Sequence, residues 1–108
     1  MSKYHSRKTV VNGIKFDSRR EADAYCKLFL LERAGKISNL RLQVPYELQE
    51  KFTLKGKTIR AIKYVADFVY TDENGVEHII DVKGVRTEVY KLKKKMFMYR
   101  YKKTIEEW

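Results

Sequence analysis

The stretch IKYVADFVYTDENGVEHIIDVKG, residues 62–84, decides the fold class that the sequence predicts. Two runs rich in β-branched and aromatic residues, 62–70 and 76–82, flank the turn sequence DENG, which is typical of a β-hairpin. Both runs carry apolar residues at odd and even positions. A strand that is apolar on both faces lies in the middle of a covered sheet. We therefore expect two central strands joined by a hairpin.

Two aspartates and a lysine interrupt these apolar runs. Asp67 falls in the first run, Asp81 falls in the second, and Lys83 directly follows the second. Aspartate is disfavoured in strands, and ionised side chains are rarely buried without partners. A three-residue loop at 73–75, with its glycine in the left-handed conformation, would place Asp67 opposite Asp81 and Lys83 on the same face. A two- or four-residue loop would separate the two carboxylates.

This spacing predicts a particular chemistry. Two unit charges 4 Å apart repel by about 4 kcal/mol at an effective dielectric constant near 20, so a shared proton, a cation or Lys83 must offset the repulsion between Asp67 and Asp81. Aspartate oxygens suit Mg²⁺, which keeps bound waters that can attack a phosphodiester. The alternatives are solvent exposure at the strand ends for the aspartates and simple charge neutralisation for Lys83.

The rest of the chain predicts an α/β domain with a mixed sheet. Residues 1–8 have the composition of a flexible basic arm, and residues 9–108 form a single domain. The expected elements are a hairpin at 9–16 around Asn12-Gly13, a helix at 19–34 capped by Ser18, a strand at 40–48 in which Pro45 indicates an edge or a bulge, a turn at 51–58 around Gly56, a helix at 87–101 and a strand at 104–108.

The second predicted helix has an apolar and a basic part. We expect the apolar stripe to comprise Val89, Leu92, Met96 and Tyr99, with Phe97 widening it. The basic part comprises Lys91, Lys93, Lys94 and Lys95. We expect these lysines to contact phosphates, and a solvated helix face is the alternative.

The charge of the chain indicates the kind of partner. The 108 residues include 24 Lys and Arg against 14 Asp and Glu, a net charge of +10. This excess favours a polyanion, and nucleic acid is preferred over an acidic membrane surface because no long amphipathic basic helix is present. The single Cys26 excludes an intramolecular disulfide and a Cys-rich zinc site. No run is long and apolar enough for a membrane span, so we expect a cytoplasmic protein.

Three segments in order resemble a known superfamily. They are FDSRREA at 16–22, YVADF at 64–68, and DVKG at 81–84 with TEVYKLK at 87–93. Asp67 followed by Asp81-Val82-Lys83 resembles the signature of PD-(D/E)XK nucleases, and the segments together resemble small phage-encoded members related to Holliday junction resolvases. The resemblance covers about residues 10–101. Ala66 stands where the motif has proline, a position that shapes the backbone and does not bind metal.

The resemblance implies a restriction-endonuclease-like α-β-β-β-α-β core, with the N-terminal hairpin preceding it, and a metal site of Glu21, Asp67 and Asp81 beside Lys83. It also implies dependence on Mg²⁺, for which Mn²⁺ substitutes, and cleavage that leaves a 5′-phosphate. Helix capping from Ser18 is the alternative role for Glu21. Gln43 is an accessory candidate, and Arg19 and Arg20 are candidate DNA contacts.

The expected function is therefore that of a structure-selective DNA endonuclease, specifically a phage-type Holliday junction resolvase in the host cytoplasm. The expected substrate is branched or duplex DNA. Two symmetric nicks need two sites, which predicts a homodimer. A less selective nuclease and a catalytically silent DNA-binding module are the alternatives.

Overall fold

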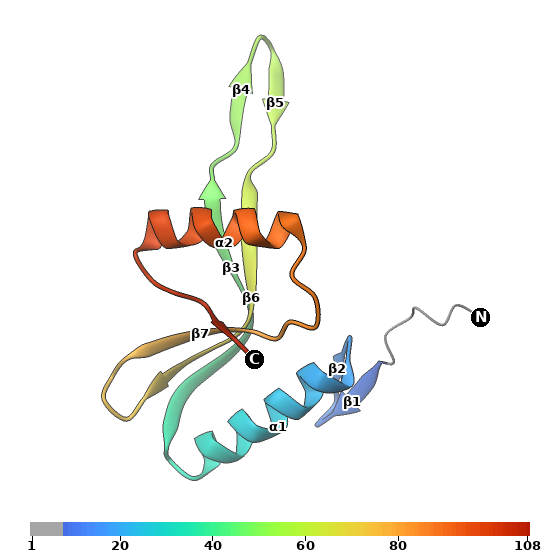
Figure 1. The fold of residues 1–108 in the computed structure, drawn as a ribbon, viewed down its shortest axis with the longest axis vertical. Coiled ribbons are helices and arrows are strands. Elements are labelled where there is room, and N and C mark those ends of the chain that lie inside the picture. Colours follow the sequence, from blue (N-terminus) through green and yellow to red (C-terminus); the bar gives the residue numbers. More distant parts are fainter. Residues whose placement is uncertain (1–7) are drawn as a thin grey trace, which may run out of the picture.

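Four strands form the central sheet of the protein, which a computed structural model describes over residues 8–108 (Figure 1). Their order is β3-β6-β7-β8, and only the β7–β8 pair is parallel. The predicted mixed α/β class is confirmed. The elements are β1 Thr9–Val11, β2 Ile14–Phe16, α1 Arg19–Arg33, β3 Ile37–Gln49, β4 Phe52–Leu54, β5 Lys57–Ile59, β6 Ile62–Asp72, β7 Glu77–Asp81, α2 Glu88–Tyr101 and β8 Glu106–Glu107.

The hairpin between β6 and β7 has the predicted register. The Asp72 N–H donates to the Val76 carbonyl at 2.8 Å, which leaves a three-residue loop, and Gly75 has φ 82°. The ladder runs from Thr71↔Glu77 to Phe68↔Ile80, so the next position sets Asp67 against Asp81. The sequence-based prediction of a central hairpin with a three-residue loop is confirmed, and its register is the one in which the two aspartates are expected to oppose each other.

The two helices cover different parts of the sheet and create two apolar cores. Phe68 of β6 and Ile80 of β7 are fully buried in the core that α1 covers. Their neighbours Val69 and Ile79 are buried in the core that α2 covers. The strands β6 and β7 are thus apolar on both faces because each face packs against a helix, as predicted.

Both long strands change their buried face at one level of the sheet. In β6, Ala66 belongs to the α2 core, whereas Phe68, two residues later, belongs to the α1 core. In β3, Val44 packs against the α2 core and Leu42 against the α1 core. Alternate residues of a regular strand share a face, so the backbone must depart from regularity between them. Gln43 does so with φ 52°.

Two hairpins lie outside the central sheet. The β1–β2 hairpin turns at Asn12 and Gly13, which have φ 50° and 77°, as the Asn-Gly sequence predicts. The second hairpin, β4–β5, extends the β3–β6 pair far beyond α2 (Figure 1). The turn predicted around Gly56 is confirmed, and two paired strands flank it. Pro45 lies on the edge strand β3, also as predicted.

The predicted apolar stripe of α2 is wrong for Val89, Leu92 and Tyr99, whereas Met96 and Phe97 pack in the α2 core as predicted. Val89, Leu92 and Tyr99 are 63%, 58% and 79% exposed, whereas the helix is anchored by the buried Tyr90 and Phe97. The apolar row is present on the helix, but a different face of the helix packs against the sheet. On that face the rings of Tyr90 and Phe97 lie in the α2 core. The exposed row therefore needs a separate explanation.

Most of the predicted basic arm, residues 1–8, lies outside the described residues. Within residues 8–108, no helix combines the length and apolar character needed to cross a membrane.

Candidate active site

The aspartates of β6 and β7 lie where the strands change their buried face. The Asp67 Oδ2 atom accepts a hydrogen bond from the Val82 N–H at 2.8 Å, which ties β6 to the end of β7. Asp81 is 3% exposed and is the one charged residue that is buried within residues 8–108. Its Oδ2 atom accepts a 2.6 Å hydrogen bond from the Tyr64 hydroxyl. The two carboxylates are therefore held by separate partners in one region.

The first helix brings a third carboxylate to the same region. The Ser18 side chain caps α1 by accepting from the Glu21 N–H at 3.1 Å. The Glu21 side chain points elsewhere, because its Oε2 atom accepts from Gln43 Nε2 at 3.2 Å. The same nitrogen also lies 3.4 Å from Asp67 Oδ1. The amide of Gln43 thus joins a carboxylate of the helix to a carboxylate of the sheet.

The pKa values reflect the crowding of negative charge. Burial, followed by the charges of Asp67, Asp17 and Asp81, raises the pKa of Glu21 from 4.5 to about 7. Burial also raises the pKa of Asp67, with a further contribution from Asp81, although the Val82 N–H opposes this shift. Ionisation of Glu21 and Asp67 is therefore unfavourable in the folded protein, and a nearby cation would stabilise the ionised carboxylates.

Lys83 lies beside the buried aspartate. Its Nζ atom is 3.3 Å from Asp81 Oδ1 and 4.3 Å from the centre of the Tyr90 ring on α2. Because its side chain is 30% exposed, the ammonium group is reachable from solvent. The predicted proximity of Asp81 and Lys83 is confirmed, and an aromatic ring of α2 fixes the direction of the lysine.

The described side chains do not form a closed metal site. Within residues 8–108, no three or more His, Cys, Asp or Glu side chains are grouped so that they could hold a metal ion. Two contacts explain this. The Gln43 amide lies between Glu21 and Asp67, and the Tyr64 hydroxyl occupies one oxygen of Asp81. These neutral donors and Lys83 satisfy the carboxylates in the arrangement described.

The predicted basic residues have different environments. Lys94 forms a 2.8 Å ion pair with Glu107, and Lys91 lies 3.6 Å from Glu88. Arg19 pairs with Asp23 at 3.2 Å on the exposed face of α1. The remaining predicted contacts line surface hollows: Arg20 in one that also contains Lys83, Lys93 in one that also contains Asp81, and Lys95 on the outer side of α2.

Two hollows meet at Lys83. One has a volume of about 300 Å³ and is lined by Lys63, Tyr64, Asp81, Lys83 and Lys93 among others. The other has a volume of about 450 Å³ and includes Arg20, Lys83 and Arg86. Cations thus flank the buried carboxylate on both sides, an arrangement suited to an anionic strand. Sequence reasoning missed Lys63 and Arg86, because neither belongs to a motif or a charge run.

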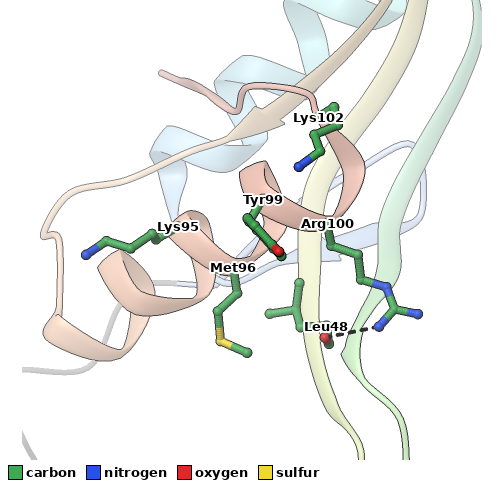
Figure 2. A pocket seen from close by; sticks show the side chains of 6 residues that line it. All are labelled: Leu48, Lys95, Met96, Tyr99, Arg100 and Lys102. Atoms are coloured by element: carbon green, nitrogen blue, oxygen red, sulfur yellow. Dashed lines mark hydrogen bonds between the residues drawn. The ribbon is translucent and has the colours of Figure 1, made fainter.

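A larger hollow lies between α2 and Leu48 of β3 and shares no lining residue with the carboxylate cluster. It has a volume of about 660 Å³ (Figure 2). Arg100 closes one side by donating to the Leu48 carbonyl at 3.2 Å, while Met96 and Tyr99 supply apolar surface. Its size alone does not connect it with the candidate chemistry.

Sequence reasoning also missed the role of Tyr64. A tyrosine in an apolar strand predicts core packing, and its ring does pack in the α2 core. Its hydroxyl, however, contacts the buried aspartate, and burial together with that hydrogen bond raises the pKa of Tyr64. Only the register of the two strands could have indicated this contact.

Comparison with known proteins gives a family without an assigned activity. Residues 1–108 match the family model described as "Protein of unknown function (DUF1064)". No curated protein and no solved structure matches the chain.

Proposed function

Since the chain belongs to the DUF1064 family, which carries no activity with it, we propose from the site itself that the protein is a metal-dependent DNA endonuclease of the PD-(D/E)XK type. The observation that carries this proposal is the convergence of Glu21, Asp67 and Asp81 beside Lys83. The charges of Asp67 and Asp81 help to raise the pKa of Glu21, and the charge of Asp81 helps to raise that of Asp67, a crowding that a structural role alone does not favour. The order α1-β3-β6-β7-α2-β8 supports a restriction-endonuclease-like core.

The donor chemistry fits a hard divalent cation. All three acidic side chains offer oxygen ligands, which Mg²⁺ and Mn²⁺ prefer. The side-chain N–H group of Gln43 donates to Glu21 and Asp67, at a place where a cation would also attract both carboxylates. Glu21, Asp67 and Asp81 would hold the ion once the hydrogen bonds from Gln43 and Tyr64 to their carboxylate oxygens are broken. When bound, such an ion supplies Lewis acidity and an activated water.

The residues of the chain itself have separable roles in phosphodiester hydrolysis. A water oxygen bonds to phosphorus while the bond from phosphorus to the 3′ oxygen breaks, and the leaving oxygen takes a proton, which gives a 5′-phosphate. Lys83 lies where its charge can orient the water or hold a phosphate oxygen. The basic residues of the two adjoining hollows, Lys63 and Lys93 on one side and Arg20 and Arg86 on the other, hold the flanking phosphates.

Within this class we propose a Holliday junction resolvase acting in the cytoplasm. A single chain presents one candidate site, so the two symmetric nicks of a four-way junction require a homodimer. The exposed row on α2 suits the dimer contact, because Val89, Leu92 and Tyr99 follow the heptad spacing by which helices pair. Light scattering should show a dimer that Leu92→Glu converts to a monomer.

Cleavage and substrate choice can be tested together. Wild-type protein should nick a labelled four-way junction with Mg²⁺ or Mn²⁺ and leave it intact in chelator. Asp81→Asn and Asp67→Asn should abolish nicking and keep or increase DNA affinity, because each removes negative charge from a phosphate-facing site. Asp23→Asn is a matched control, since Asp23 is an exposed acid of α1. Equal nicking by the two site variants and wild type would disprove the assignment.

A catalytically silent DNA-binding module is the second candidate. Two observations favour it: the described acids do not close around a metal position, and Lys83 is already engaged by Asp81 and Tyr90. Such a module would bind junctions in chelator but never nick them with either metal. A less selective nuclease would instead cut linear duplex as fast as junctions.

A further inference from the structure

The β4–β5 hairpin has no packing role that explains its composition. We define the wing as residues 50–61, which comprise β4, β5 and their turn. Residues 50–60 are all exposed, so within the described chain nothing covers them. The wing contributes to the elongated shape, with a longest extent of 53 Å and a radius of gyration of 16.2 Å. A compact domain of this length has a radius of gyration of about 13 Å.

The wing is amphipathic across its two faces. Phe52 pairs with Ile59, and Leu54 lies two residues along the same strand, so these three apolar side chains share one face. They are 41%, 38% and 59% exposed in that order. The opposite face carries the pair Thr53 and Thr58. An isolated two-stranded hairpin is at best marginally stable in water, so an uncovered apolar face indicates a partner.

The charge of the wing identifies the kind of partner. It contains four cations and one carboxylate, a net charge of +3: Lys51, Lys55, Lys57 and Arg60 against Glu50. Two copies of the wing meeting about a two-fold axis would bring equal charges together. A polyanion would neutralise them. The wing therefore complements nucleic acid better than it complements a second wing.

The turn of the wing places a cation at its tip despite a backbone cost. Lys55 and Gly56 have φ 50° and 75°, as a two-residue hairpin turn requires at both central positions. Asparagine, aspartate or glycine usually occupies the first of these positions, and lysine there is unfavourable. Lys57 follows directly and pairs with Leu54, so two lysines lie at the tip of the wing.

We propose that the wing is a second DNA-binding element, which enters the branch point of a DNA junction. Its cations bind phosphates of the separating strands, and its apolar face packs against base surfaces that are unstacked there. A two-stranded ribbon has dimensions that fit a DNA groove, and inserted apolar side chains are a common means of contacting opened base steps. This inference rests on the proposed DNA substrate, but it does not require the protein to cut.

Three variants separate charge, apolar surface and the wing as a whole. The first replaces residues 50–61 by Asn-Gly, which closes a short hairpin because Gln49 pairs with Ile62. The second is Lys55→Asn with Lys57→Thr, which keeps the turn and removes both tip charges. The third replaces Phe52, Leu54 and Ile59 by threonine, which retains strand propensity. Leu30→Gln with Lys36→Gln is the matched control, at the far end of α1.

Binding is measured by fluorescence anisotropy in the Asp81→Asn background with chelator, on a four-way junction and a linear duplex, at several salt concentrations. Removal of the tip charges should reduce the slope of log affinity against log salt by about 2, since each phosphate contact contributes about 0.9. The threonine variant should bind the junction about 5- to 100-fold more weakly, the range for losing base stacking, with less effect on the duplex. The control variant should bind like its parent.

Several outcomes would overturn the inference. Unchanged salt slopes and junction affinity in all three variants would do so. So would an equal loss on junction and duplex for the threonine variant, which would indicate general groove binding. Light scattering on the same samples tests the second copy as occupant: a change from dimer to monomer with unaltered DNA binding would assign the wing to self-association. Absence of nicking by wild type, with wing-dependent junction binding retained, would refute only the nuclease proposal.

Discussion

Replacing Glu21 by glutamine should make the metal-free protein more stable at neutral and alkaline pH. The change removes a charge that burial and the carboxylates of Asp67, Asp17 and Asp81 disfavour, while the capping contact from the Glu21 N–H to Ser18 uses the backbone and remains. An acid needed only for helix capping would show the opposite behaviour, with lost stability. The variant therefore separates the two roles.

The sign and size of the effect follow from the pKa. Because the pKa of Glu21 rises from 4.5 to about 7 on folding, the folded state binds more protons than the unfolded state between these values. Wild-type stability therefore falls as pH increases from about 4.5 to about 7. The full shift corresponds to about 3 kcal/mol, and solvent screening at this partly exposed site reduces the expected gain to about 1–2 kcal/mol.

The assay is thermal and urea unfolding in chelator between pH 4 and pH 9. Glu21→Gln should match wild type at pH 4 and exceed it at pH 8, with a melting temperature higher by about 5–10 °C. Ser18→Ala is the control and should lose about 1 kcal/mol at every pH, because it removes the capping acceptor. A variant that is less stable than wild type at pH 8 would refute the argument that Glu21 is held against electrostatic repulsion.

Three further predictions concern particular contacts. Lys93→Gln should lower the salt slope of DNA binding by about 1, measured by fluorescence anisotropy. Lys94→Gln should instead cost about 1 kcal/mol of stability, measured by urea unfolding, because Lys94 pairs with Glu107. Gln43→Gly should be more stable than Gln43→Ala by about 1 kcal/mol in urea, since φ 52° favours glycine. His78→Gln should lose about 1 kcal/mol at pH 6 and nothing at pH 9. The hydrogen bonds of His78 to Asp72 and Glu106 raise its pKa, so its contribution is complete below pH 6.5 and disappears as pH rises through the folded value.

Each of these predictions has a contrary outcome. A stability loss for Lys93→Gln equal to that of Lys94→Gln would remove Lys93 from the DNA-binding set. If Gln43→Ala proved the more stable variant, the left-handed backbone at this position would be excluded. A pH-independent effect of His78→Gln would show that its stacking on Tyr70, at 4.8 Å between ring centres, matters more than its charge.

The sequence predicts local structure well where the chain carries its own signal. Asn12-Gly13 and Gly75 specify turns by backbone conformation, and Ser18 specifies a helix start, so each element begins close to its predicted position. The register of the β6–β7 hairpin follows from the loop length. The sequence alone therefore predicts that Asp67 and Asp81 face each other.

Features that depend on distant packing could not be predicted in this way. The orientation of α2 is set by where Tyr90 and Phe97 meet the sheet, so Val89, Leu92 and Tyr99 are exposed although their spacing predicts burial. The contact of Tyr64 with Asp81 needs two strands and their twist. Glu107 is another feature that the sequence does not predict. Hydrogen bonds from Lys94 and Tyr90 lower its pKa to about 2, although nothing near it in sequence indicates an ion pair.

The level at which the sheet changes its buried face accounts for the placement of the candidate site. A regular β6 would keep Ala66 and Phe68 on one face, so a single helix would cover both. Because β3 and β6 switch together, α1 and α2 cover opposite faces of neighbouring segments, and Asp67 lies at their boundary. The switch has a cost, since Gln43 adopts a conformation unfavourable for a residue with a side chain. That same residue bridges Glu21 and Asp67. Backbone strain and carboxylate repulsion therefore coincide at one point, which neither packing nor strand propensity would select without a functional reason.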